Sequence, residues 1–509
     1  MIQSRSFRSV DWLTIFLCLL LIGFGIMNVY SVDPEKGMRQ LIFFGLSIFL
    51  IIGLISASSI SSNVFEMYSP VLYLFSLILL LGVLIFGREI NGAKAWFDFG
   101  FVSFQPVEVA KLATGLLLAN YVSSPATDLK SRKSILTVFG MMGIPVVLIL
   151  LQPDLGSVLV FSAFIIALYR EGFSAWFIFL PVIGGALFLL SITVPPYYIL
   201  TGIGLLTVII SLVIIAFTYN RRTLRTMSGI QAGLFFYFLI LVALQYFFPE
   251  LGAIADETSK EYVSPELLAF NVYLYSAIGM AISVLSVISV SYFILKDNAE
   301  SPFKSSGSGF GADLTYETSI ITVLIFGFIA GISLSSGKVY EKLPQHQRER
   351  IMVLFEGESK YRDTSGYNLL YSKTAIGSGD LLGKGYLQGT VKIGRFVPEQ
   401  STDYIFCTVG EEWGFVGSAA LILIFGFFIL RLYYLAENQR SVFARFFGYS
   451  VATIFLIHFF INIAMVMGLF PTVGIPLPFF SYGGSSLWAF ITLVTVFLIL
   501  NYNDKKSLI

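Results

Sequence analysis

Long apolar runs constrain this chain more than any other feature. Runs of roughly twenty residues recur along most of the sequence, and that length spans a bilayer core of about 30 Å. Of the 509 residues, 56% are hydrophobic and 12% are charged, whereas a soluble domain has about 25% charged residues. A water-soluble protein with this composition would have too little polar surface to cover itself. The sequence therefore predicts an all-α, polytopic membrane protein.

The apolar runs predict fourteen spans. They are 12–30, 40–57, 69–86, 106–121, 135–151, 156–169, 175–195, 199–219, 229–248, 268–295, 317–336, 405–431, 446–469 and 485–502. We read the first as an uncleaved span, because it is longer than the apolar region of a usual signal peptide and no Ala-x-Ala cleavage site follows it. An even number of spans places both termini on the same side of the membrane.

Lys and Arg indicate which side that is. Short loops on one side contain Lys130, Arg132, Lys133, Arg221, Arg222, Arg225, Arg431, Arg440 and Arg445, whereas the opposite loop 249–267 is acidic. Cytoplasmic loops carry an excess of Lys and Arg, so we predict cytoplasmic termini. The net charge of +1 gives no basic field, and so no argument for nucleic acid as a partner.

The segment 337–404 is the only large element predicted outside the membrane, on the extracytoplasmic side. It contains Gly366-Tyr-Asn, Ile376-Gly-Ser-Gly and Gly383-Lys-Gly, separated by apolar residues rather than by low-complexity sequence. Glycines in such positions indicate tight turns or close approach of the backbone. We therefore expect a structured loop there, and a flexible cytoplasmic linker at the Ser/Gly-rich stretch 301–311.

Charged residues inside or at the rim of spans are costly in a bilayer, so they are candidates for a functional site. Glu108 and Lys111 are three residues apart and share one helix face, where they can neutralise each other. A structural ion pair and a pair that faces a polar cavity are equally consistent with this spacing. Asp154 follows a proline where a helix is expected to begin, so a capping role is favoured there.

Asp403 lies at the end of the large loop, directly before the apolar run 405–431. One alternative is again a helix cap, for which Ser401 and Thr402 compete. We favour a functional role, because a carboxylate at the mouth of a bundle suits a general base that must reach a substrate at the membrane interface.

Three other features are assigned no chemistry. The Pro/Gly-rich stretch 474–486 contains no acid or base, so its predicted role is to shape the site. His458, near Asn462 on an apolar helix, is read as a packed, hydrogen-bonded core residue. His346 has no Cys or second His nearby, so a zinc site is not predicted.

Taken together, these residues resemble the SEDS family (shape, elongation, division, sporulation), and within it the RodA-like branch. The motifs that carry the resemblance are Gly92…Trp96, Phe104-Gln-Pro-Val-Glu-Val-Ala-Lys-Leu, Gln152-Pro-Asp-Leu-Gly-Ser, His346-Gln-Arg-Glu-Arg-Ile, Gly366-Tyr-Asn, Gly383-Lys-Gly, Gly389-Thr, Thr402-Asp-Tyr-Ile-Phe, Gly410-Glu-Glu-Trp-Gly-Phe-Val-Gly and Pro476-Leu-Pro-Phe-Phe-Ser-Tyr-Gly-Gly-Ser-Ser. The Gly-Lys-Gly and Gly-Thr motifs are more like the elongation branch than the division branch.

The resemblance implies a peptidoglycan glycosyltransferase of the bacterial cytoplasmic membrane, which polymerises lipid II beside a class B penicillin-binding protein. It implies that Asp403 is the essential carboxylate, and that Trp96, Glu108 and Lys111 are substrate-site positions. Three residues depart from the family pattern, namely Ser401, Asp380 and Ala95.

The resemblance also implies a core of fewer spans than this chain has. We expect residues 1–196 to form the first seven spans, 337–404 the large loop and 405–509 the last three spans. Residues 197–336 would then be an insert of four spans, for which a partner-docking surface is one possible role.

The expected reaction needs a base for the acceptor hydroxyl and positive charge for the leaving pyrophosphate. We predict Asp403 as the base, and Arg348, Lys373, Lys384 and Arg395 as cations from the same loop. A divalent cation such as Mg²⁺ or Mn²⁺ is a further possibility for charge dispersal, without an assigned protein site. A flippase for lipid-linked sugars and a non-catalytic scaffold remain as alternatives, since both also suit a chain with many spans.

Overall fold

The computed structural model describes residues 11–56, 61–90, 92–100, 103–194, 335–390 and 397–506, with short pieces between 198 and 332. The chain divides into two compact units, Met1–Ile178 with Glu349–Ile509, and Phe179–Arg348. The second unit contains most of α9 (Trp176–Thr193). The candidate site lies in the first unit, which is described below.

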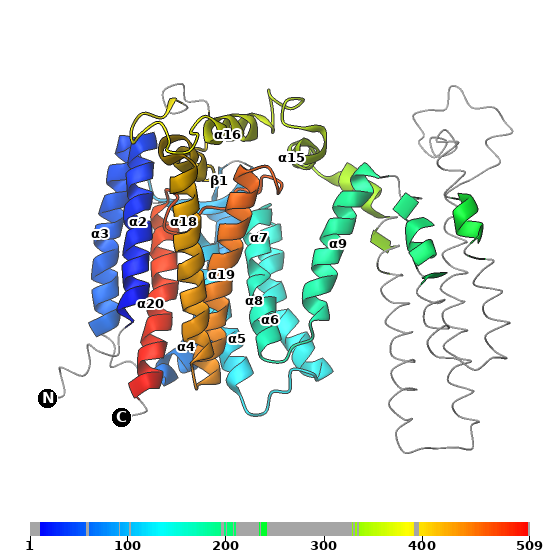
Figure 1. Cartoon of the computed structure of the whole chain (residues 1–509). Coiled ribbons are helices and arrows are strands. Elements are labelled where there is room, and N and C mark those ends of the chain that lie inside the picture. Colours follow the sequence, from blue (N-terminus) through cyan, green and yellow to red (C-terminus); the bar gives the residue numbers. More distant parts are fainter. Residues whose placement is uncertain are drawn as a thin grey trace, which may run out of the picture. The chain divides into compact units, whose positions relative to one another are not determined.

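The first unit is a bundle of upright helices (Figure 1). They are α2 (Trp12–Val32), α3 (Pro34–Ser56), α4 (Ser62–Phe86), α5 (Pro106–Ser123), α6 (Arg132–Leu150), α7 (Leu155–Phe161), α8 (Ala163–Arg170), α18 (Ile405–Glu437), α19 (Val442–Val466) and α20 (Gly484–Lys506). The start of α2 and the end of α20 lie at the same end of the bundle, and α16 (Tyr367–Gly377) lies across the other end (Figure 1).

Within the described part of the chain, seven helices are long and apolar enough to cross a membrane: α2, α4, α6, α9, α18, α19 and α20. A multi-pass, mostly helical membrane protein is therefore confirmed. The predicted spans 199–219, 229–248, 268–295 and 317–336 lie largely or wholly outside the described residues. The count of fourteen thus stays a prediction.

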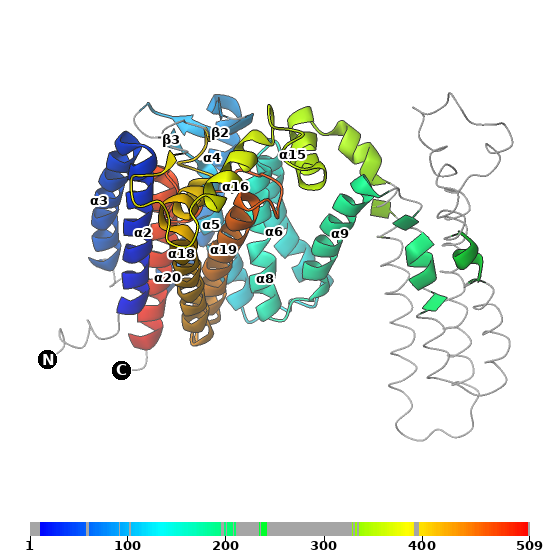
Figure 2. The ribbon, with the colours of Figure 1, turned by 45° about the horizontal axis from the view of Figure 1, so that its top comes forward.

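A three-stranded antiparallel sheet corrects the expectation of an all-α fold. It contains β1 (Arg88–Ile90), β2 (Ala93–Asp98) and β3 (Ser103–Phe104), in the order β1-β2-β3. It lies at the same end of the bundle as α16 (Figure 2). The segment between α4 and α5 is too short and too polar to span, and its aromatic residues favour strands, with Phe97 opposite Phe104.

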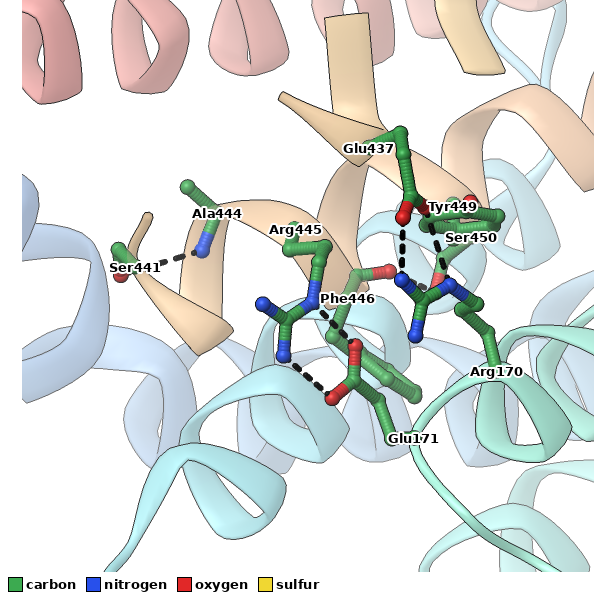
Figure 3. Close-up of polar contacts among 9 residues, drawn as sticks. All are labelled: Arg170, Glu171, Glu437, Ser441, Ala444, Arg445, Phe446, Tyr449 and Ser450. Carbon is green, nitrogen blue, oxygen red and sulfur yellow. Dashed lines mark hydrogen bonds and ion pairs between the residues drawn. The ribbon is translucent and has the colours of Figure 1, made fainter. Parts of the chain in front are cut away.

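Two ion pairs join the ends of α8, α18 and α19 (Figure 3). Arg445 at the start of α19 donates to both oxygens of Glu171, which follows α8, over 2.7 and 2.8 Å. Arg170 pairs with Glu437 at the end of α18, and the hydroxyl of Tyr449 also donates to that carboxylate. The α18–α19 hairpin is therefore fastened to the end of α8.

A break in α18 lets the 337–404 loop dock by its main chain. Gly414 has φ +63° inside the helix, a conformation that suits glycine. Next to this break, the amide of Lys384 donates to the carbonyl of Glu411, and the amide of Gly385 donates to the carbonyl of Glu412. Both bonds are 3.0 Å long. In return, the amide of Phe415 donates to the carbonyl of Asp380 over 2.9 Å. The loop and the helix thus share backbone hydrogen bonds.

We expect Gly379→Ala to destabilise the protein by about 1–3 kcal/mol, because the added methyl group overpacks a tight contact. A Cβ atom there would lie far inside van der Waals contact with the carbonyl oxygen of Gly410 in α18. Gly377→Ala is the matched control, since a Cβ atom at 377 meets nothing within 4 Å. Thermal unfolding in detergent measures both; equal melting temperatures for the two variants would contradict the close approach.

Candidate functional site

Asp403 lies in the turn that leads into α18, at the end of the bundle covered by α16 (Figure 1). Its amide donates to the carbonyl of Glu399 over 3.1 Å, and its own carbonyl accepts from Nδ2 of Asn462 over 2.9 Å. The capping alternative does not hold, because Tyr404 is the N-cap residue of α18 and no side chain makes a capping hydrogen bond there. The carboxylate is therefore not engaged in starting the helix.

The Asp403 side chain is half-buried, and this environment changes its acidity. Burial raises the pKa of Asp403 to about 7, and the nearby carboxylate of Glu399 acts in the same direction. The guanidinium of Arg350 opposes this rise, and Asp154 adds a smaller increase. A carboxyl group with a pKa near neutral can both take and give up a proton at physiological pH.

This acidity predicts how activity depends on pH. If Asp403 must be ionised to accept a proton, activity rises as the pH increases through about 7 and falls below it. Arg350→Gln removes a charge that favours the ionised form, so we expect the acidic limb to move to higher pH. The measurement is kcat/KM from pH 5 to 9 for both proteins; an unchanged limb would contradict the role of Arg350.

Gly474 borders the carboxylate. A Cβ atom at that position would lie 3.3 Å from Oδ2 of Asp403, and the residue has φ +70°. Glycine therefore meets the backbone requirement and leaves room beside the acid. This agrees with the prediction that the stretch 474–486 supplies shape.

Glu108 and Lys111 form the ion pair that their spacing predicted. Nζ of Lys111 lies 2.8 Å from Oε1 of Glu108, and both side chains are buried in the bundle. Lys111 also lies 3.1 Å from Nε2 of His458, whose Nδ1 lies 3.1 Å from the carbonyl oxygen of Pro476. A carbonyl can only accept, so Nδ1 of His458 donates to it and Nε2 accepts from Lys111. His458 is a buried, hydrogen-bonded residue, as predicted.

Asp154 is the N-cap of α7, as predicted. Its Oδ1 accepts from the amide of Ser157 over 3.0 Å, and its Oδ2 accepts from Nε2 of Gln105 over 3.1 Å. The second bond ties α7 to the residue before α5. Asp154 thus has a structural role, and it also contributes to the field at Asp403.

The predicted substrate-site residues are only partly brought together. Lys384 lies 2.6 Å from Glu411 and Lys373 lies 2.7 Å from Glu358, so both loop cations are paired with carboxylates. Trp96 lies in β2, opposite Arg88. Arg348 belongs to the second unit, and Arg395 lies outside the described residues.

Sequence reasoning missed two cations, one that acts on Asp403 and one that contacts Ser401. Arg350 lies two residues after the predicted Arg348 and acts electrostatically on Asp403. Lys36, in the first turn of α3, donates to Oγ of Ser401 over 3.0 Å. The motif 346–351 was a signal for Arg350, whereas nothing local in the sequence connects Lys36 with Ser401. Among the residues that the structure describes, no group of three or more His, Cys, Asp or Glu could hold a metal ion.

This arrangement defines a class: a multi-pass membrane protein with a half-buried acid at one end of its helix bundle, within the field of an arginine. Residues 11–209 and 310–506 match the family model of FtsW, RodA and SpoVE, described as a cell cycle protein. The chain therefore belongs to this family, which is the SEDS family. The unmatched residues 210–309 lie within the predicted insert 197–336.

Several proteins are similar over nearly the whole chain. The peptidoglycan glycosyltransferase RodA of Treponema pallidum is 26% identical over 99% of this chain and 100% of its own length. The peptidoglycan glycosyltransferase MrdB of Escherichia coli K12 is 25% identical, over 94% of this chain and 90% of its own.

Two solved structures share the fold. One, described as a peptidoglycan synthase complex that coordinates polymerization and crosslinking, has a TM-score of 0.56 at 22% identity and covers 97% of both chains. A structure of the rod shape-determining protein RodA of Thermus thermophilus has a TM-score of 0.51 at 20% identity, covering 97% of this chain and 98% of the other.

Proposed function

We propose that this chain is a peptidoglycan glycosyltransferase that polymerises lipid II into glycan strands at the outer face of a bacterial cytoplasmic membrane. Full-length relatives are named for this activity. The observation that carries the proposal is Asp403, a half-buried carboxyl group with a pKa raised to about 7. It lies before the first residue of α18, outside the apolar helix, and its side chain is not fully buried.

In the proposed reaction, the hydroxyl of the acceptor sugar attacks the anomeric carbon of the donor. A C–O bond to the acceptor forms, the bond to the lipid pyrophosphate breaks, and the hydroxyl proton passes to Asp403. A sugar hydroxyl is a poor nucleophile, so a positioned base contributes roughly 10²–10⁴-fold to the rate. The pyrophosphate leaves with its lipid, which stays in the membrane beside the bundle.

The departing pyrophosphate requires fixed positive charge. Arg350 and Lys36 suit this role, because one acts on Asp403 and the other contacts Ser401, two residues away. Lys373 is paired with Glu358, and Lys384 is paired with Glu411. Either lysine would have to leave its carboxylate before it could bind the pyrophosphate. Trp96, Glu108, Lys111, Arg348 and Arg395 stay candidates for contacts elsewhere on the substrate.

Orientation and biological role are part of the same proposal. The Lys and Arg of the short loops favour cytoplasmic termini, which puts Asp403 on the outer face. The motif Gly383-Lys-Gly favours the RodA-like, elongation branch. One structural neighbour is a synthase complex for both polymerization and crosslinking. We therefore expect a class B penicillin-binding protein as the partner of this chain, with the predicted insert 197–336 as its docking surface.

Purified components distinguish this function from its alternatives. The protein in detergent is supplied with fluorescent lipid II, and glycan chains are resolved on a gel. We expect chains to form in the absence of any other polymerase. Translocation of lipid II across proteoliposomes without glycan chains would support a flippase, and neither activity would support a scaffold.

A further inference from the structure

Asn462 in α19 bridges the proposed base and the segment that faces it. Its Nδ2 donates one hydrogen bond to the carbonyl of Asp403 over 2.9 Å and another to the carbonyl of Ile475 over 2.7 Å. The residue is fully buried. Both amide hydrogens are therefore used, and each fixes the main chain of a different segment.

The first of these bonds fixes the main chain that carries the carboxylate. The amide of Asp403 is already held by the carbonyl of Glu399, and Asn462 holds the carbonyl. With both backbone groups held, the Cα–Cβ bond of Asp403 has a fixed direction. The carbonyl of Thr402 accepts from Ser481, and the hydroxyl of Tyr404 is bonded to Thr472. Among the described residues, Asn462 is thus the side chain that holds the main chain of residue 403 itself.

The second bond fixes the wall beside the carboxylate. Ile475 follows Gly474, the residue whose missing side chain leaves room next to Oδ2 of Asp403. His458 lies one helical turn before Asn462 and holds the carbonyl of the next residue, Pro476, while it accepts from the buried Lys111. Two consecutive carbonyls of this wall are thus anchored to one face of α19.

We propose that Asn462 is a positioning residue for the polymerisation reaction: it sets the separation between the Asp403 carboxylate and the 474–476 wall. This inference rests on the proposed function, because it takes Asp403 as the base. Asn462 does not touch the substrate. Its effect is exerted through the two main-chain segments that it joins.

Asn462→Leu tests the proposal, since leucine has a similar size and donates no hydrogen bond. A misplaced catalytic group can cost on the order of 10²-fold, so we expect kcat for lipid II to fall by about that factor with KM unchanged. Asn120→Leu is the matched control. Nδ2 of Asn120 likewise donates to two oxygens of another helix, those of Glu66 and Ser69, outside the site.

Both variants lose a bridging amide, so a similar fall in melting temperature is expected for each. The positioning role predicts that only Asn462→Leu loses kcat, whereas equal kcat in the two variants would overturn it.

If Asn462→Leu does not fold, Asn462→Ser decides by the same measurements, because its shorter hydroxyl can donate only one hydrogen bond. Asp403→Asn is assayed in parallel. If the unaltered protein forms no glycan chains, the proposed function fails. If Asp403→Asn stays active, the base assignment fails, and the positioning role fails with it. If Asp403→Asn is inactive while the Asn462 variants keep full kcat, only the positioning role fails.

Discussion

Replacing Asp403 by asparagine is expected to reduce lipid II polymerisation by about 10²–10⁴-fold, the contribution of a positioned general base. Asparagine has the same shape, but its amide cannot accept the proton of the acceptor hydroxyl. The fold should persist, because the contacts of Asp403 with Glu399 and Asn462 are made by its main chain. Glycan formation from purified lipid II gives the rate, and thermal unfolding in detergent reports the fold.

Asp363→Asn is the matched control for this variant. Asp363 lies in the same 337–404 loop, but its side chain is exposed. We expect this variant to polymerise lipid II like the unaltered protein. Full activity of Asp403→Asn would remove the base from the mechanism, and an equal loss in both variants would indicate a general effect of altering the loop.

Lys111→Met is expected to lower the free energy of unfolding by about 3–5 kcal/mol, because it leaves the carboxylate of Glu108 buried without its cation. Oε2 of Glu108 already has no hydrogen-bond partner among the described residues, so little is available to compensate. Arg88→Met is the control. It removes the cation of the Arg88–Asp98 pair, whose arginine is largely exposed, and little change in melting temperature is expected.

The double variant Glu108→Leu with Lys111→Met distinguishes the two roles that the sequence left open for this pair. One is a structural ion pair, and the other is a pair that faces a polar cavity of the site. Replacing a whole buried ion pair by apolar residues is often neutral or stabilising, so the melting temperature should recover. A stable and active double variant would assign the pair to packing alone. A stable but inactive one would assign it to the substrate site, through His458 and the 474–476 wall.

Local patterns predicted much of the helical framework. The start of α18 at Ile405, the ion pair on one face of α5 and the cap at Asp154 all follow from neighbouring residues. The predicted span 40–57 coincides with most of α3, but the helix begins earlier, at Pro34. The signal was present: Asp33 accepts from the amides of Glu35 and Lys36 and precedes a proline, which is favoured in a first turn.

The site itself needed the three-dimensional fold. Asp403 stood out because it lies where an apolar run begins, but the contacts of Lys36 with Ser401 and of Asn462 with Asp403 join distant parts of the sequence. Their side chains carry no local pattern that pairs them. The choice between Arg348 and Arg350 likewise depends on which of two nearby residues of one helix acts on Asp403.

The break in α18 has a mechanical consequence. Hydrogen bonds between amides and carbonyls join residues 380–385 of the loop to residues 411–415 of α18. A force applied to residues 380–385 is therefore passed to the first turns of α18. Asp403 lies directly before those turns. Exchanging the exposed side chains of Leu381 and Leu382 leaves these bonds intact. A side chain at Gly383 would disturb them, because its Cβ atom would lie far inside van der Waals contact with the carbonyl oxygen of Glu412. A change in the path of the backbone at 380–385 would therefore displace the turns of α18 that follow Asp403.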